Sequence, residues 1–90
     1  MPYRIRVPAE AKRDLRELPG HVRERAWRLI DSLADQPRPL GAKELRDNPG
    51  VYRLRLDRWR LSYEVSEDDQ IVLVLAVRRK TGPETYTDLG

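Results

Sequence analysis

Four arginines, Arg53, Arg55, Arg58 and Arg60, lie close together in the middle of the chain. They alternate with apolar residues in the stretch V-Y-R-L-R-L-D-R-W-R-L-S-Y-E-V, which covers residues 51–65. A guanidinium group keeps its positive charge at neutral pH, and its planar set of donors matches the geometry of a phosphate group. The cluster therefore predicts a binding site for a phosphate-bearing partner.

The period-two alternation on both sides of Asp57-Arg58 predicts a β-hairpin with those two residues as its turn. One face of this hairpin carries apolar residues and is expected to face the core. On the other face the register places Arg55 directly opposite Arg60. Arg53 lies beside this pair, and Arg58 lies at the tip. Like charges in directly opposite positions destabilise a strand pair, so the arrangement indicates that an anion binds there.

The composition limits the classes of protein and of site. Ninety residues suit a single domain, 1–90, near the lower end of the size that buries a self-sufficient core. The chain carries 18 Lys and Arg against 15 Asp and Glu, and the local cluster of four arginines within residues 53–60, more than the total, favours a polyanionic partner. The absence of cysteine and the single histidine argue against disulfides, thiolate nucleophiles and the usual metal sites, so no cofactor is expected. Because no apolar run approaches a membrane span and no signal peptide is recognisable, we expect a cytoplasmic protein without a membrane partner.

The hydrophobic periodicity predicts the elements that position the hairpin, in the order β-α-α-β-β-β. Besides the hairpin, they are a strand at residues 2–7, a helix from Pro8 that stops at Pro19-Gly20, a helix at about 21–35, a loop at 37–50 with a brief extended piece at 42–45, and an apolar central strand at 71–77. The expected fold class is α+β. It consists of a small antiparallel β-sheet with an N-terminal two-helix hairpin packed on one face.

Four motifs follow one another along the chain: A-K-R-D-L-R-E-L in the first helix, P-x-P-L-G-A-K-E-L before the hairpin, Y-R-L-R-x-x-x-W-R-L-x-Y in the hairpin, and a hydrophobic strand that runs into R-R-K and then a tyrosine. In their order and spacing, which cover nearly the whole chain, they resemble the RelE/ParE superfamily of bacterial type II toxins. The RelE branch of that family implies an mRNA endonuclease that works in the ribosomal decoding site. In the mechanism that the resemblance implies, the ribose 2′-hydroxyl attacks the adjacent phosphate and leaves a 2′,3′-cyclic phosphate and a 5′-hydroxyl.

The resemblance also implies which residues act. Family members of this kind use basic residues on both hairpin strands, a basic residue just after the last long strand, and a tyrosine shortly beyond it. Carried over by position, the catalytic candidates are Arg53, Arg55, Arg60, Lys80 and Tyr86, and the further RNA-binding candidates are Arg58, Arg78 and Arg79.

Departures from the family pattern have chemical consequences. Arg53 and Arg55 occupy positions where RelE-type enzymes often have lysine, and arginine does not transfer a proton at neutral pH, so these two can orient and neutralise a phosphate but not protonate it. The position after the last strand, commonly arginine, is Lys80, with Arg79 as the adjacent alternative, which leaves the general acid open. The turn position usually given to glycine is Asp57, from which we expect a distorted or bulged turn.

Each candidate also has a structural interpretation. The arginines could instead form a solvated sheet face paired with acids such as Glu64, although the expected Arg55-Arg60 juxtaposition favours an anion site. Tyr86 is a candidate base if nearby cations stabilise its phenolate, or a stacking platform for a nucleobase; alternatively, it covers exposed core. Lys80 is equally compatible with the solvated end of an apolar strand.

His21, Trp27 and Trp59 are interpreted as structural residues. His21 is the usual type of acid-base group near neutral pH, but it starts a helix far along the chain from the arginines, so we expect it to be structural or solvated. Both tryptophans fit core positions by periodicity and are not expected to stack on nucleotides.

Three functions remain open. The complete basic set with Tyr86 favours a ribosome-dependent mRNA interferase that inhibits translation. A ParE-like toxin directed at DNA gyrase would share the fold without needing that set, and a non-catalytic nucleic-acid-binding member of the same fold fits the arginine-for-lysine pattern. Either toxin implies a cognate antitoxin that masks the basic face, and the RelE branch adds the ribosome and mRNA as partners. The toxin-antitoxin complex is further expected to bind operator DNA through the antitoxin.

Overall fold

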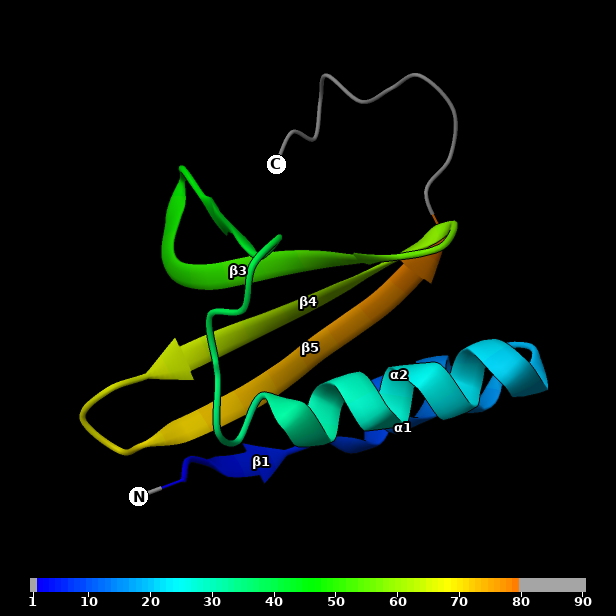
Figure 1. Cartoon of the computed structure of the whole chain (residues 1–90), viewed down its shortest axis with the longest axis horizontal. Helices are drawn as coiled ribbons and strands as arrows, with labels where there is room; N and C mark the ends of the chain where they lie inside the picture. The colour runs from blue at the N-terminus through cyan, green and yellow to red at the C-terminus, as the bar shows by residue number, and fades with distance from the viewer. Residues whose placement is uncertain (1, 80–90) are drawn as a thin grey trace.

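The computed structural model describes residues 2–79, which form two helices and five strands (Figure 1). In chain order these are β1 (Arg4–Arg6), α1 (Ala9–Arg16), α2 (Gly20–Ser32), β2 (Lys43–Leu45), β3 (Asn48–Leu56), β4 (Trp59–Ser66) and β5 (Ile71–Arg79). The α+β fold class predicted from the periodicity is confirmed. Neither helix of this part of the chain has the length and apolar character needed to cross a membrane.

The five strands form one mixed sheet in the order β1-β5-β4-β3-β2. Strands β2 to β5 pair in the antiparallel sense, but β1 runs parallel to β5, with Ile5 opposite Val72. The prediction of an antiparallel sheet is therefore wrong at this edge. Strand β5 lies in the interior between β1 and β4, as its apolar sequence requires, but the central position belongs to β4.

Strands β3 and β4 form the predicted hairpin in the predicted register, with Arg55 directly opposite Arg60. Asp57 adopts a left-handed backbone conformation with φ of 56°, which short polar residues tolerate better than most others. The turn thus closes without any shift in the pairing of β3 with β4, and the expected bulge is absent from this pairing. A register shift occurs instead between β4 and β5, at Ser62 and Tyr63.

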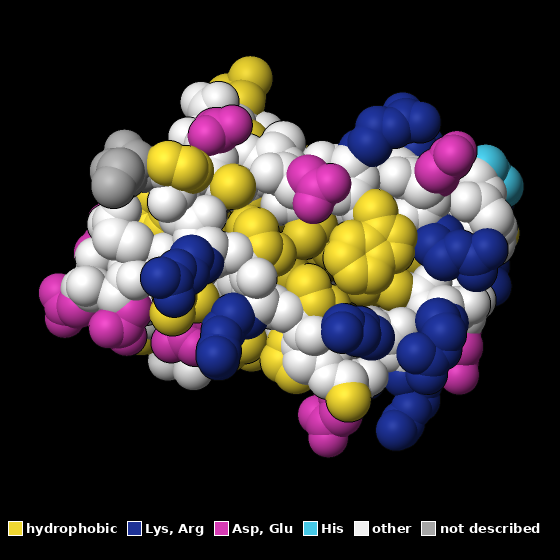
Figure 2. Space-filling view, turned by 90° about the horizontal axis from the view of Figure 1, so that it is seen from below, with side chains coloured by type: hydrophobic (Ala, Val, Ile, Leu, Met, Phe, Trp, Pro, Cys, Tyr) yellow, Lys and Arg dark blue, Asp and Glu magenta, His cyan; other side chains and the backbone are white. Residues whose placement is uncertain are grey.

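The apolar faces of both helices and of the sheet meet in one core. Its buried residues are Ala11, Leu15, Leu18, Val22, Ala26, Ile30, Leu33, Leu54, Leu56, Leu61, Tyr63, Val65, Val72, Val74 and Val77. Trp27 and Trp59 are partly buried and pack against this core, in agreement with their predicted positions. Figure 2, which views the molecule from the side of β1 and the helices, shows hydrophobic side chains in the middle of this face and several Lys and Arg toward one end. Because the helices cover one face of the sheet, the other face of β3 and β4 is available to charged side chains.

Helix α1 is joined to β5 by a polar side chain. Strand β1 pairs with β5 along Ile71–Leu73, so backbone groups farther along the same edge of β5 need other partners. The Asp14 carboxylate accepts a hydrogen bond from the Val77 N–H at 3.0 Å, and its Oδ2 lies 3.5 Å from Arg78 Nε. Asp14 thus supplies a hydrogen-bond acceptor to the edge of β5 beyond the residues that pair with β1.

The segment that leads from α2 to β2 is tied to the sheet by two tyrosines. The hydroxyl of buried Tyr63 donates a hydrogen bond to the Pro37 carbonyl at 2.7 Å. The next residue, Arg38, donates from Nε to the Tyr52 hydroxyl at 2.8 Å and forms an ion pair with Glu67. These contacts fix the chain just before it enters β2.

Candidate nucleic-acid interface

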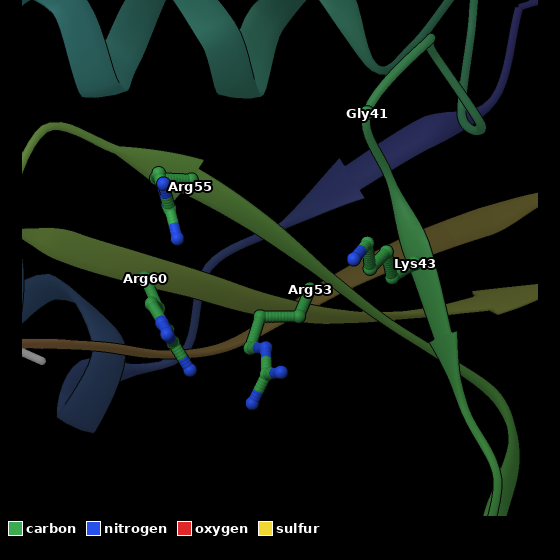
Figure 3. A pocket seen from close by; sticks show the side chains of 5 residues that line it. All are labelled: Gly41, Lys43, Arg53, Arg55 and Arg60. Atoms are coloured by element: carbon green, nitrogen blue, oxygen red, sulfur yellow. The ribbon is translucent and has the colours of Figure 1, made fainter. Parts of the chain in front are cut away.

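A pocket of about 320 Å³ opens on the face of the sheet opposite the core, and we call it the basic pocket. Its lining residues are Gly41, Lys43, Arg53, Arg55 and Arg60. Figure 3 shows that the four cationic side chains come from three neighbouring strands: Lys43 from β2, Arg53 and Arg55 from β3, and Arg60 from β4. The structure therefore brings three of the predicted catalytic candidates around one cavity.

Strand pairing explains why these side chains share a face. Arg55 lies directly opposite Arg60, and Lys43 lies directly opposite Arg53. Residues in opposite positions project to the same side of a sheet, as do residues two apart on one strand. Leu54, which separates the two arginines of β3, points the other way and is buried in the core.

The basic pocket carries a concentrated positive charge. Within residues 2–79, no ion pair joins a carboxylate to Lys43, Arg55 or Arg60. Glu64, the acid considered as a neutralising partner, is exposed on β4 and makes no ion pair with the described part of the chain. Cations held side by side in this way attract an anion of complementary shape, and their fixed positions can stabilise charge that develops on a phosphate.

A second pocket, of about 410 Å³, lies between the hairpin turn and the start of α2. It is lined by two of the RNA-binding candidates, Arg58 and Arg79, together with Trp59 and His21. The Arg79 guanidinium lies over the Trp59 ring, 5.8 Å from its centroid, in cation–π geometry. Although His21 lies far along the chain from these arginines, the fold brings the start of α2 to the turn of the hairpin. His21 itself is exposed, as expected.

The remaining candidates lie elsewhere. Arg78 is opposite Arg60 in the pairing of β4 with β5, but its Nε lies near the Asp14 carboxylate and its side chain is 77% exposed. It therefore does not line either of these pockets. Lys80 and Tyr86 lie outside the described residues, so their roles stay predictions.

Two residues of the basic pocket, Lys43 and Gly41, were not predicted to belong to a site. Both residues belong to the motif P-x-P-L-G-A-K-E-L, which could have drawn attention to them. Whether Lys43 lies beside the arginines, however, depends on the pairing of a three-residue strand with β3. Gly41 has φ of 99°, where a side chain strains the backbone, and it turns the chain into β2. Among the described residues, no group of three or more His, Cys, Asp or Glu side chains is arranged to hold a metal ion.

Comparison with known proteins adds a family match and several relatives. The model of a family described as the ParE toxin of type II toxin-antitoxin system, parDE, matches residues 5–81. The mRNA interferase toxin RelE of Escherichia coli (strain K12) is 28% identical, over 98% of this chain and 94% of that protein. The crystal structure of isolated E. coli RelE superposes with a TM-score of 0.79 at 26% identity, covering 96% of this chain and 93% of that one. The intact E. coli RelBE toxin-antitoxin complex gives a TM-score of 0.76 at 27% identity, covering 88% and 98% of the two chains.

Proposed function

This chain belongs to the ParE toxin family of type II toxin-antitoxin systems, and from that premise we propose that it acts as a ribosome-dependent mRNA endonuclease. Its predicted membership of the RelE/ParE superfamily is confirmed. Under the proposal, the ribose 2′-hydroxyl of a bound mRNA attacks the adjacent phosphate, the strand is cut, and translation stops. The E. coli relative that is named an mRNA interferase supports the RelE-like branch.

One observation carries the proposal, namely the direct juxtaposition of Arg55 and Arg60 at the basic pocket. Strand pairing places the two side chains in directly opposite positions on one face of the sheet, where like charges destabilise a strand pair and a bound anion would offset that cost. A phosphodiester supplies that anion. Its transition state carries more negative charge than its ground state, so fixed cations favour the reaction as well as the binding.

The proposed roles follow from position. Arg55 and Arg60 hold the non-bridging oxygens of the scissile phosphate, and Arg53 positions the neighbouring backbone. A single well-aimed donor typically contributes about 10²- to 10³-fold in rate. Tyr86 remains the proposed base or stacking platform, and the family pattern offers Lys80 as one candidate for the proton donor.

Primer extension on a defined mRNA in a purified translation system tests this function. The wild-type protein should cut at codons positioned by the ribosome, and Arg60→Ala should cut about 10²- to 10³-fold more slowly. Arg28→Ala removes one positive charge from the exposed surface of α2 and is the matched control, expected to cut like the wild type. Tyr86→Phe separates the two tyrosine roles, since a stacking platform needs no hydroxyl. Circular dichroism should show the same fold for all variants, and rapid cutting by folded Arg60→Ala would contradict the assignment.

A gyrase-directed toxin is the second candidate, because the family model that matches the chain is named for ParE. Such a toxin would share this fold and act by binding its target protein. Absence of ribosome-positioned cuts together with inhibition of gyrase supercoiling would move the assignment to that branch. A protein that binds RNA and shows neither activity would be a non-catalytic member of the fold.

The proposed partners are a cognate antitoxin, the ribosome and mRNA. The E. coli relative forms a toxin-antitoxin complex with RelB, which supports an antitoxin for this chain. We expect the antitoxin to place acidic residues over the basic pocket, and its complex with the toxin to bind operator DNA through the antitoxin. The proposed location is the cytoplasm, where ribosomes and mRNA meet.

A further inference from the structure

We propose that Lys43 is a catalytic residue and that its ammonium group protonates the departing 5′-oxygen. The inference rests on the mRNA endonuclease activity proposed above. It assigns the general acid to the short strand β2, whereas the family pattern offers Lys80 or Arg79 after β5.

Lys43 forms part of the wall of the basic pocket. Its side chain is exposed, and it lies directly opposite Arg53 in the pairing of β2 with β3. Arg55 and Arg60 complete the lining from the next strands (Figure 3). A phosphodiester held between these two arginines would therefore have an ammonium group on one side of it.

Lys43 differs chemically from the arginines beside it. A guanidinium group keeps its proton at neutral pH, so Arg53, Arg55 and Arg60 can bind and neutralise but cannot act as general acids. An ammonium group can release a proton to an oxygen that gains charge as its bond to phosphorus breaks. Of the described residues that line the basic pocket, Lys43 is the one with a side chain able to do this.

Local contacts hold strand β2 in place, as a proton donor requires. The Gly50 N–H donates a hydrogen bond to Glu44 Oε2 at 2.9 Å, which ties β2 to the beginning of β3. The Ala42 N–H donates to the Pro39 carbonyl at 3.0 Å and closes the turn that precedes the strand. Since no ion pair within residues 2–79 engages Lys43, its ammonium group is available to a ligand in the pocket.

The reaction step balances with Lys43 as the acid. The 2′-oxygen forms a bond to phosphorus and gives its proton to a base or to water. The bond between phosphorus and the 5′-oxygen breaks, and the 5′-oxygen takes the bonding electrons and a proton from Lys43 Nζ. Lys43 becomes a neutral amine and regains a proton from water after the products leave. Arg55 and Arg60 stabilise the non-bridging oxygens throughout and exchange no proton.

Single-turnover cleavage of a ribosome-bound mRNA tests the assignment. Lys43→Arg keeps the positive charge but cannot supply the proton, so its cleavage rate should fall about 10²- to 10⁴-fold while its affinity for RNA is unchanged. Lys80→Arg also keeps the positive charge and removes the ammonium group, so its cleavage rate tests the alternative proton donor. Lys12→Arg makes the same substitution on the exposed surface of α1 and should cleave like the wild type. Circular dichroism checks that each variant is folded.

A second mRNA, with sulfur in place of the bridging 5′-oxygen at the scissile phosphate, separates proton donation from charge. A thiolate leaves without being protonated, so Lys43→Arg should cleave this mRNA at the wild-type rate. A defect that persists on the sulfur substrate, or a wild-type rate of Lys43→Arg on the normal mRNA, would overturn the assignment. The assignment would also be overturned if the sulfur-substituted mRNA restored the cleavage rate of Lys80→Arg but not that of Lys43→Arg. Failure of the proposed function looks different, because the wild-type protein would then cut neither mRNA.

Discussion

Tyr63 is the residue that connects the core to the segment entering the basic pocket. Its ring is fully buried and stacks on the Tyr52 ring, with 5.8 Å between the centroids, and its hydroxyl donates to the Pro37 carbonyl. Burial, with a smaller contribution from Tyr52, raises the pKa of Tyr63 to about 12. The folded state therefore favours the neutral phenol more strongly than the unfolded chain does.

We expect this preference to make the stability depend on pH in the alkaline range. An unfolded tyrosine has a pKa of about 10, so the contribution of Tyr63 is fully present below pH 10 and is lost as the pH rises through about 12. Between pH 9 and pH 11, the free energy of unfolding of the wild type should fall by about 1 kcal/mol more than that of Tyr63→Phe. Urea denaturation at the two pH values measures the difference. At pH 7 the variant should be less stable by about 1 kcal/mol, because it lacks the hydrogen bond to Pro37. Equal alkaline losses in the two proteins would contradict this account.

The direction of a single side chain was predictable from the sequence wherever its neighbours along one strand decide it. The alternation of Arg53 and Arg55 with Leu54 settles which side chains face the core, because successive residues of a strand point to opposite faces. Lys43 lacks such a pattern, since its strand has three residues and its place depends on pairing with β3. The same holds for His21, whose neighbours in the second pocket include residues of the hairpin turn and the last residue of β5.

Helix α1 supports β5 through Asp14, whose side chain is 22% exposed. We expect Asp14→Ala to lower the free energy of unfolding by about 2 kcal/mol, because the Val77 N–H loses a charged acceptor in a partly buried position. Asp14→Asn should cost less, since an amide oxygen can still accept the hydrogen bond. Chemical denaturation of the two variants measures both effects.

Arg78→Ala is the control for the ion pair formed by Asp14. Its side chain is largely exposed, so the loss of the pair should change the free energy of unfolding by at most about 1 kcal/mol. A destabilisation by Arg78→Ala as large as that by Asp14→Ala would contradict the role given to the hydrogen bond.

Pairing between elements was predictable when a short turn joins them. The hairpin of β3 and β4 is closed by Asp57 and Arg58, so its register follows from the alternation alone. The parallel pairing of β1 with β5 joins the two ends of the described chain, and no turn residue specifies it. The contact of Arg25 Nη1 with Asp57 Oδ2, at 2.6 Å, likewise depends on how α2 packs against the sheet, which periodicity does not determine.

The distribution of charge over the surface matters more for binding than the net charge does. The net charge is +3, yet the sheet face that the helices leave open gathers four cationic side chains in one pocket of about 320 Å³. The helix side has a different character, with hydrophobic side chains in the middle of the face shown in Figure 2. An RNA that uses the basic pocket is held mainly by charge, whereas an antitoxin that wraps the molecule can also bury apolar surface.

We therefore expect the affinity for RNA to depend on salt more steeply than the affinity for the antitoxin. If four cations each contact a phosphate of single-stranded RNA, raising the salt from about 50 to about 200 mM should weaken binding roughly 50-fold. Fluorescence anisotropy with a labelled oligonucleotide measures this, and the same titration with labelled antitoxin should give a smaller loss. Arg55→Ala should make the logarithmic salt slope shallower by about 0.7, whereas Arg28→Ala should leave it unchanged. Equal salt slopes for RNA and antitoxin would contradict this expectation, because the antitoxin would then release as many counterions on binding as the RNA does.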